Sequence, residues 1–140
     1  MKIEIGNILD ITKGTICQQV NCKKVAGAGL AMQIRNKYPK WYKEFLEFDG
    51  NLGEVFLYKV NELTIASLYS QENYGRLEDR YTDYNAFTEC LFSLEEKTRE
   101  INETIYFPYK IGCGLGKGDW RYIESQIKFV FPDAILIKLR

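Results

Sequence analysis

Two glycine-rich loops carry the residues that could do chemistry in this chain of 140 residues. The first lies within Gln18–Ala31, QQVNCKKVAGAGLA, between a β-rich run and a helical pattern. The second, Ile111–Gly118, also follows a β-rich run and contains four glycines in seven residues. Glycines let backbone N–H groups come close to a ligand, and the unpaired N–H groups at a helix start favour an anion. Two such loops in one small protein predict two phosphate cradles that face a single diphosphate.

Neither loop fits the familiar nucleotide motifs. A dinucleotide-binding fingerprint needs a glycine or alanine three residues after Gly29, and the chain has Met32 there. A P-loop needs one more residue between Gly112 and Lys117, and Gly118 replaces its serine or threonine. The alternative for either loop is a tight turn that binds nothing, and it stays open at this point.

The chain has no histidine. This excludes Ser-His-Asp and Cys-His catalysis and every metal site that contains histidine. The four cysteines, Cys17, Cys22, Cys90 and Cys113, form no Cys-x-x-Cys pair and fall on four different segments. We therefore expect no metal and no cofactor.

Composition and charge describe one domain with a substantial core. Hydrophobic residues make up 46% and aromatic residues 14%, which excludes a disordered chain. Lys+Arg and Asp+Glu are both 19, so no general polyanion-binding field exists and nucleic acid is not the expected partner. The N-terminus reads as a strand interrupted by charge rather than a signal peptide, and no run reaches membrane-spanning length. We expect a single domain over residues 1–140, monomeric and cytoplasmic, with no membrane association.

The apolar periodicity predicts six strands with helices between them. The expected strands are Lys2–Ile5, Thr15–Val20, Glu54–Val60, Leu63–Tyr69, Thr104–Tyr109 and Ala134–Leu139. The expected helices are Gly29–Tyr38, Lys40–Phe48, one capped by Thr82 or Asp83 that ends near Ile101, and one capped by Asp119. The central hairpin predicts a mixed sheet with helices on both faces. Residues 71–81 are polar and too long for a simple connection, which is typical of binding loops and lids.

Four segments together resemble the macrodomain family, which binds ADP-ribose. They are Gly6-Asn7-Ile8, Val20-Asn21-Cys22, Val25–Ala31 and Pro108–Leu115. They span nearly the whole chain in the order of the family. The pattern is most similar to the branch of terminal ADP-ribose glycohydrolases, DNA-directed antitoxin macrodomains and the yeast ADP-ribose 1″-phosphate phosphatase, and to small bacterial and phage members. The resemblance implies a three-layer α/β/α fold with a six-stranded mixed sheet.

The resemblance also implies roles for particular residues. Asn7 stands where the family usually has the aspartate that recognises adenine, and Ile8 would offer a backbone N–H to the base. Asn21 would face the distal ribose and is the one candidate catalytic residue. The diphosphate would lie between the two glycine loops. The ligand-binding residues implied in this way are Gly6, Asn7, Ile8, Asn21, Gly27, Ala28, Gly29, Leu30, Ile111, Gly112, Cys113, Gly114, Leu115 and Gly116.

The chain departs from the catalytic residues of that branch. The glycohydrolases use a lysine where this chain has Ser70-Gln71, and an aspartate where it has Gly116; the phosphatase has a histidine where it has Gln18. Two functions therefore stay open: hydrolysis of an ADP-ribose derivative, such as the 1″-phosphate or an ADP-ribosyl ester, and non-catalytic binding of ADP-ribose signals. The carboxylates expected near the site, Asp83 and Asp119, also have a capping explanation.

Three other residues near the site each have two possible roles. Cys113 could be a packing residue or a thiol whose pKa is lowered by the anion-binding loop. Arg76 and Arg80 could be solvated loop charges or ligand clamps.

Overall fold

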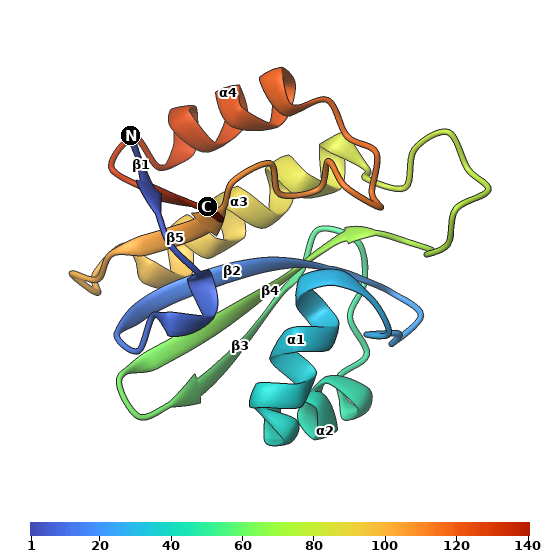
Figure 1. Cartoon of the computed structure of the whole chain (residues 1–140), viewed down its shortest axis with the longest axis horizontal. Helices are drawn as coiled ribbons and strands as arrows, with labels where there is room; N and C mark the ends of the chain where they lie inside the picture. The colour runs from blue at the N-terminus through green and yellow to red at the C-terminus, as the bar shows by residue number, and fades with distance from the viewer.

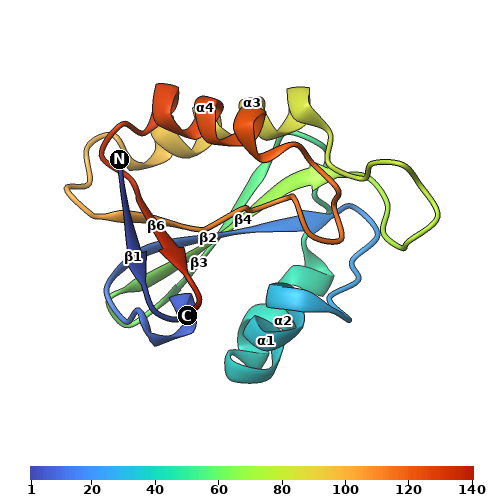
Figure 2. The ribbon, with the colours of Figure 1, turned by 45° about the horizontal axis from the view of Figure 1, so that its top comes forward.

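A computed structural model describes all residues, 1–140, as one mixed β-sheet between two pairs of helices. Figures 1 and 2 show that helices α1 (Gly29–Lys37) and α2 (Pro39–Glu47) cover one face of the sheet. Helices α3 (Tyr84–Thr98) and α4 (Trp120–Val130) cover the other face. The predicted three-layer α/β/α architecture is confirmed.

The sheet has six strands in the order β1-β6-β5-β2-β4-β3. They are β1 (Lys2–Ile5), β2 (Gly14–Asn21), β3 (Val55–Val60), β4 (Leu63–Gln71), β5 (Ile105–Pro108) and β6 (Ile135–Lys138). Only the β3–β4 hairpin is antiparallel, so the predicted mixed sheet is confirmed.

The strand order brings the two glycine loops to one edge of the sheet. Strands β2 and β5 are parallel neighbours, so their carboxyl ends lie side by side. After β2 the chain passes to α1 on one face, and after β5 it passes to α4 on the other face. Ligands of open α/β sheets bind at such a point, where consecutive connections leave to opposite sides.

Each face of the sheet has its own apolar core. On the side of α3 and α4, the fully buried side chains include Phe87, Leu91, Phe107, Ile123 and Ile127. On the side of α1 and α2 they include Ile16, Ile34, Trp41, Phe45 and Ile65. Trp41 and Phe45 belong to the aromatic stripe expected for α2, and their rings stack at 4.8 Å. The two cores fix the sheet between its helices.

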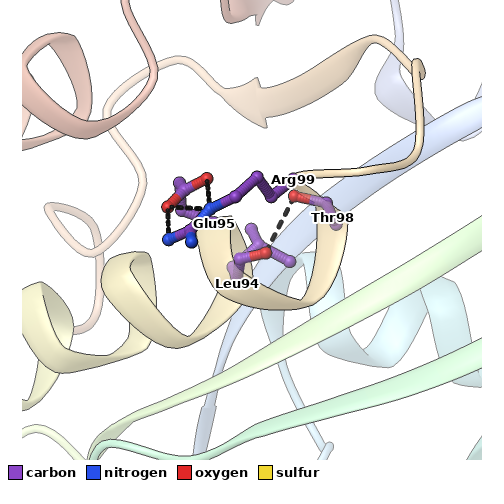
Figure 3. Close-up of polar contacts among 4 residues, drawn as sticks. All are labelled: Leu94, Glu95, Thr98 and Arg99. Carbon is purple, nitrogen blue, oxygen red and sulfur yellow. Dashed lines mark hydrogen bonds and ion pairs between the residues drawn. The ribbon is translucent and has the colours of Figure 1, made fainter.

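Helix α3 begins and ends with side-chain contacts. Asp83 is its N-cap, and the Asp83 carboxylate accepts a hydrogen bond of 2.9 Å from the N–H of Ala86. Figure 3 shows the last turn, where the Thr98 hydroxyl donates to the Leu94 carbonyl at 2.8 Å and Arg99 pairs with Glu95 at 2.6 Å. The helix ends at Thr98 rather than near Ile101 because the Ile101 N–H turns back to the Thr98 carbonyl.

No helix of the chain is both long and apolar enough to cross a membrane.

Candidate functional site

A cavity of about 590 Å³ lies at the carboxyl ends of β2 and β5. Its walls come from four segments that are far apart in the sequence: the end of β2, the first glycine loop with the start of α1, the segment after β4, and the second glycine loop. The lining residues are Gln18, Gln19, Val20, Asn21, Val25, Gly27, Ala28, Gly29, Leu30, Ala31, Gln71, Tyr74, Gly75, Arg76, Pro108, Tyr109, Lys110, Ile111, Gly112, Gly114, Leu115 and Gly116.

Helix α1 starts at this cavity with an open N-terminus. Its N-cap, Ala28, has no side-chain oxygen to accept a hydrogen bond. None of the N–H groups of residues 27–31 has a partner within the chain. Helices α3 and α4, in contrast, are capped by Asp83 and Asp119. An uncapped helix start with a positive dipole end is suited to hold an anion.

The side chain of Asn21 shapes the first loop. Its Nδ2 donates to the Val25 carbonyl at 2.8 Å, and its Oδ1 accepts from the N–H groups of Lys23 and Val25, both at 3.1 Å. These bonds use both oxygen lone pairs and one amide hydrogen. Asn21 lines the cavity and keeps one Nδ2 hydrogen for another partner.

The second glycine loop also has backbone N–H groups without a partner. The N–H groups of Gly112, Gly114, Leu115 and Gly116 donate no hydrogen bond within the chain. All four residues line the cavity. Because unpaired backbone donors are costly when they are withdrawn from water, a ligand with several acceptor oxygens suits this loop.

A polar network beneath the second loop fixes its position. The Thr82 hydroxyl donates to the Gly112 carbonyl at 2.7 Å. Gln19 Nε2 donates to Thr82 Oγ1 at 2.9 Å and to Gln71 Oε1 at 2.7 Å, and the Ser70 hydroxyl donates to Gln19 Oε1 at 2.7 Å. The loop is thus tied to β2 and β4 by side chains.

Glycine is required where the loop touches this network. A Cβ at Gly116 would lie 2.5 Å from Thr82 Oγ1 and 2.7 Å from the Gly112 carbonyl oxygen. At Gly114, by contrast, nothing lies within 4 Å of an added Cβ. The spacing of the glycines therefore reflects two needs, close packing at Gly116 and open space at Gly114.

The charges of the cavity are all positive. Arg76 and Lys110 line it, and no aspartate or glutamate does. Asp83 and Asp119, the two carboxylates expected near the site, serve as N-caps and are not among the lining residues. The cavity therefore favours an anionic ligand and contains no group that is a strong base at neutral pH.

The segment implied for adenine lies outside the lining of the cavity. Gly6, Asn7 and Ile8 are not among the lining residues. The side-chain Oδ1 of Asn7 caps η1 (Ile8–Asp10) by accepting from the N–H of Leu9 at 3.0 Å, and the Ile8 N–H has no partner within the chain.

Cys113 is the one residue of the second loop's predicted set that does not line the cavity. Its side chain packs against the core on the side of α3 and α4. Burial raises the pKa of the Cys113 thiol, and the nearby Asp119 raises it further while Lys110 lowers it. Cys113 thus has the character of a packing residue.

The sequence left Arg76 open between a solvated loop charge and a ligand clamp, and the structure places it at the cavity. The sequence did not assign Gln71, Tyr74, Gly75, Tyr109 and Lys110 to the site, although they line the cavity as well. The available signal was the length and polarity of residues 71–81. That signal predicts a binding loop but cannot say which of its side chains face the cavity.

No protein-family model matches the sequence. An uncharacterised 17.5 kDa protein of the tk-vs intergenic region of Enterobacteria phage T4 is 29% identical over 120 residues, covering 79% of this chain and 75% of the phage protein. The DNA ADP-ribosyl glycohydrolase of Mycobacterium tuberculosis is 24% identical over 140 residues, which cover 92% of this chain and 39% of that enzyme. The chain therefore matches well under half of the mycobacterial relative.

Solved structures share the fold over nearly the whole chain. The macrodomain of Mycobacterium tuberculosis DarG superposes with a TM-score of 0.79 at 20% identity, covering 97% of both chains. Thermosipho africanus DarTG, solved in complex with ADP-ribose, gives a TM-score of 0.79 at 17% identity, covering 99% of this chain and 42% of that one. The chain has the macrodomain fold, and the resemblance stated from the sequence is confirmed at the level of the fold.

Proposed function

We propose that this chain binds one ADP-ribose, or a derivative of it, with the diphosphate between Gly27–Leu30 and Gly112–Gly116. The observation that carries the proposal is the pairing of two sets of unpaired backbone N–H groups around one cavity that has two cations and no carboxylate. A diphosphate supplies the acceptor oxygens and the negative charge that this arrangement lacks.

The comparisons support the choice of ligand. A neighbour with the same fold, Thermosipho africanus DarTG, has been solved with ADP-ribose. In the proposed complex the nucleoside end extends toward Gly6, Asn7 and Ile8, and Asn21 meets the distal ribose. Ile111 and Cys113 support the second loop. Fold analogy alone does not assign a ligand, so the proposal rests on the donors and charges of the cavity.

Hydrolysis of an ADP-ribose derivative is the second candidate, and the alternative is a non-catalytic reader. Similarity to a DNA ADP-ribosyl glycohydrolase favours hydrolysis. In this candidate a positioned water attacks at the distal ribose or its 1″-phosphate, Asn21 orients the ribose, and the loop N–H groups stabilise developing negative charge. A general base contributes about 10²–10⁴-fold to rate, and the cavity offers none at neutral pH, so turnover should be slow.

The proposal also covers the oligomeric state, the cellular location and the partner of the chain. We infer a monomeric, cytoplasmic macrodomain over residues 1–140 that needs no metal or cofactor and takes ADP-ribose or its derivative, rather than a nucleic acid polymer, as its partner. Light scattering at several protein concentrations tests the monomer, because self-association would raise the measured mass.

Calorimetry with ADP-ribose, AMP and NAD tests binding, and a matched pair of variants tests the loop. Gly29 has φ +59° and open space around its Cβ position, so Gly29→Glu and Gly29→Gln carry the same backbone strain and nearly the same bulk. Gly29→Glu should abolish binding because its carboxylate occupies the phosphate position, and Gly29→Gln should lose less. No heat with millimolar ADP-ribose would reject the proposal, and equal affinities of the two folded variants would show that no anion binds beside Gly29.

Turnover assays separate the two candidates. The substrates are ADP-ribose 1″-phosphate, an ADP-ribosyl ester and ADP-ribosylated DNA, each with wild type and Asn21→Ala. A hydrolase should lose turnover in Asn21→Ala far more than it loses ADP-ribose affinity. A wild-type chain that binds ADP-ribose but turns over none of the three is a reader.

A further inference from the structure

The segment of residues 72–81, here called the strap, passes beside the second glycine loop, as the adjacent yellow-green and orange segments show in Figures 1 and 2. The strap contributes Tyr74, Gly75 and Arg76 to the wall of the cavity. The Arg76 guanidinium has no carboxylate, carbonyl or aromatic partner within the chain, although Arg80 lies 4.1 Å from the centre of the Tyr84 ring. The positive charge of Arg76 is thus unpaired and lies at a cavity that has several unpaired backbone N–H donors.

Lys117 ties the strap to the second loop. Its Nζ donates to the Glu78 carbonyl at 2.6 Å and to the Arg76 carbonyl at 3.0 Å. Two of the three ammonium hydrogens are therefore committed to the strap. In the sequence GLGKGD, Lys117 looks like a phosphate-binding lysine, yet it is not among the residues that line the cavity.

Tyr81 supplies the rest of the attachment. Its hydroxyl accepts from the N–H groups of Leu77 at 3.0 Å and Glu78 at 3.1 Å. Its own N–H donates to the Gly116 carbonyl at 2.9 Å. Apart from the contact of Arg80 with the Tyr84 ring, the attachments of the strap between Arg76 and Tyr81 run to Lys117, to Gly116 or within the strap. This part of the strap is therefore tied mainly to the second glycine loop.

We propose that Arg76 is a further ligand-binding residue that contacts the diphosphate, and that Lys117 is a positioning residue that holds Arg76 over the cavity. This inference rests on the proposed diphosphate site. It adds the guanidinium of Arg76 to that site, and the position of Arg76 depends on Lys117. The class of ligand that it recognises is a diphosphate, whether in ADP-ribose or as inorganic pyrophosphate.

The test compares Arg76→Gln, Lys117→Met, the double variant and the control Lys128→Met, an equal charge change on an exposed position of α4. Calorimetry measures the affinity for ADP-ribose and for pyrophosphate. Loss of one charge-assisted hydrogen-bonding group should weaken binding by about tenfold to a hundredfold in Arg76→Gln. Because Lys117 acts through Arg76, adding Lys117→Met to Arg76→Gln should cost little more, and Lys128→Met should bind as wild type does.

Amide hydrogen exchange of the ligand-free chain distinguishes the two possible roles of Lys117. If Lys117 only bound phosphate directly, its substitution would leave exchange in the strap unchanged. Lys117→Met should speed exchange of the strap amides, Leu77 and Glu78 above all, while Lys128→Met leaves them unchanged. Unchanged strap exchange in Lys117→Met, or affinity losses that multiply in the double variant, overturns the role of Lys117. Wild-type affinity in Arg76→Gln overturns the role of Arg76. If the chain binds pyrophosphate through Arg76 but not ADP-ribose, the proposed function fails and this inference stands; if it binds neither, both fail.

Discussion

At the scale of single residues, substitutions of Asp119 distinguish a structural role of this residue from a catalytic role. Its carboxylate caps α4 by accepting from the N–H of Arg121 at 3.0 Å. Asparagine also caps helices well, whereas alanine does not, so Asp119→Ala should lower the free energy of unfolding by about 0.5–2 kcal/mol and Asp119→Asn by much less. Urea denaturation measures both values. Any turnover should survive in Asp119→Asn; a folded Asp119→Asn chain that has lost turnover would identify Asp119 as an acid–base group.

At the scale of the element, the second glycine loop has one position that needs glycine for packing and one that does not. Gly116→Ala should lower the free energy of unfolding by about 1–3 kcal/mol, because the new methyl group collides with Thr82 and with the Gly112 carbonyl. Gly114→Ala, two residues away, adds a methyl group to open space and should stay close to wild type in stability. Thermal or chemical denaturation of the pair is the measurement. Equal stability of the two variants would mean that the loop does not rest on the Thr82 network.

At the scale of the whole molecule, the partly buried thiol of Cys22 and the buried thiol of Cys90 should make the free energy of unfolding fall at alkaline pH. Burial is the main cause that raises the pKa of Cys22 to about 11 and that of Cys90 to about 12. A thiol in the unfolded chain ionises at about pH 8.5, so the unfolded state loses its protons first. The stabilising contribution is therefore complete below that pH and decreases as the pH rises toward the folded-state pKa.

Cys22→Ser provides the control for this whole-molecule effect, because serine does not ionise in the range. Denaturant unfolding from about pH 8 to about pH 10 should show wild type losing more stability than Cys22→Ser. Parallel pH profiles for the two chains would show that the environment of Cys22 does not disfavour its thiolate.

The elements were predictable because each depends on local signals. Apolar periodicity gave all six strands, and Asp83 and Asp119 marked the starts of α3 and α4. The sheet order was not predictable, because it depends on which strands meet after the helices pack. The repeated order of strand, glycine loop and helix predicted that the two loops face one ligand, and the parallel pairing of β2 and β5 gives the physical reason.

The side chains around the loops were less predictable, since their roles depend on tertiary contacts. Arg76 reaches the cavity because Lys117 and Tyr81 hold the strap there, and no local pattern encodes those contacts. Asn21 matches the pattern of the resemblance and Asn7 replaces its usual aspartate, and the amides of both form local hydrogen bonds that only the folded backbone reveals.

A nuclear magnetic resonance titration of the ¹⁵N-labelled chain with ADP-ribose tests the central claim most directly, because it reports binding and its place together. We expect saturable shifts of the amide signals of Gly27–Ala31 and of Gly112, Gly114, Leu115 and Gly116, the groups that have no partner within the chain. AMP, which lacks the diphosphate, should shift these signals far less. Shifts confined to other parts of the chain, or none at millimolar ADP-ribose, would contradict the assignment of the two glycine loops as a diphosphate site.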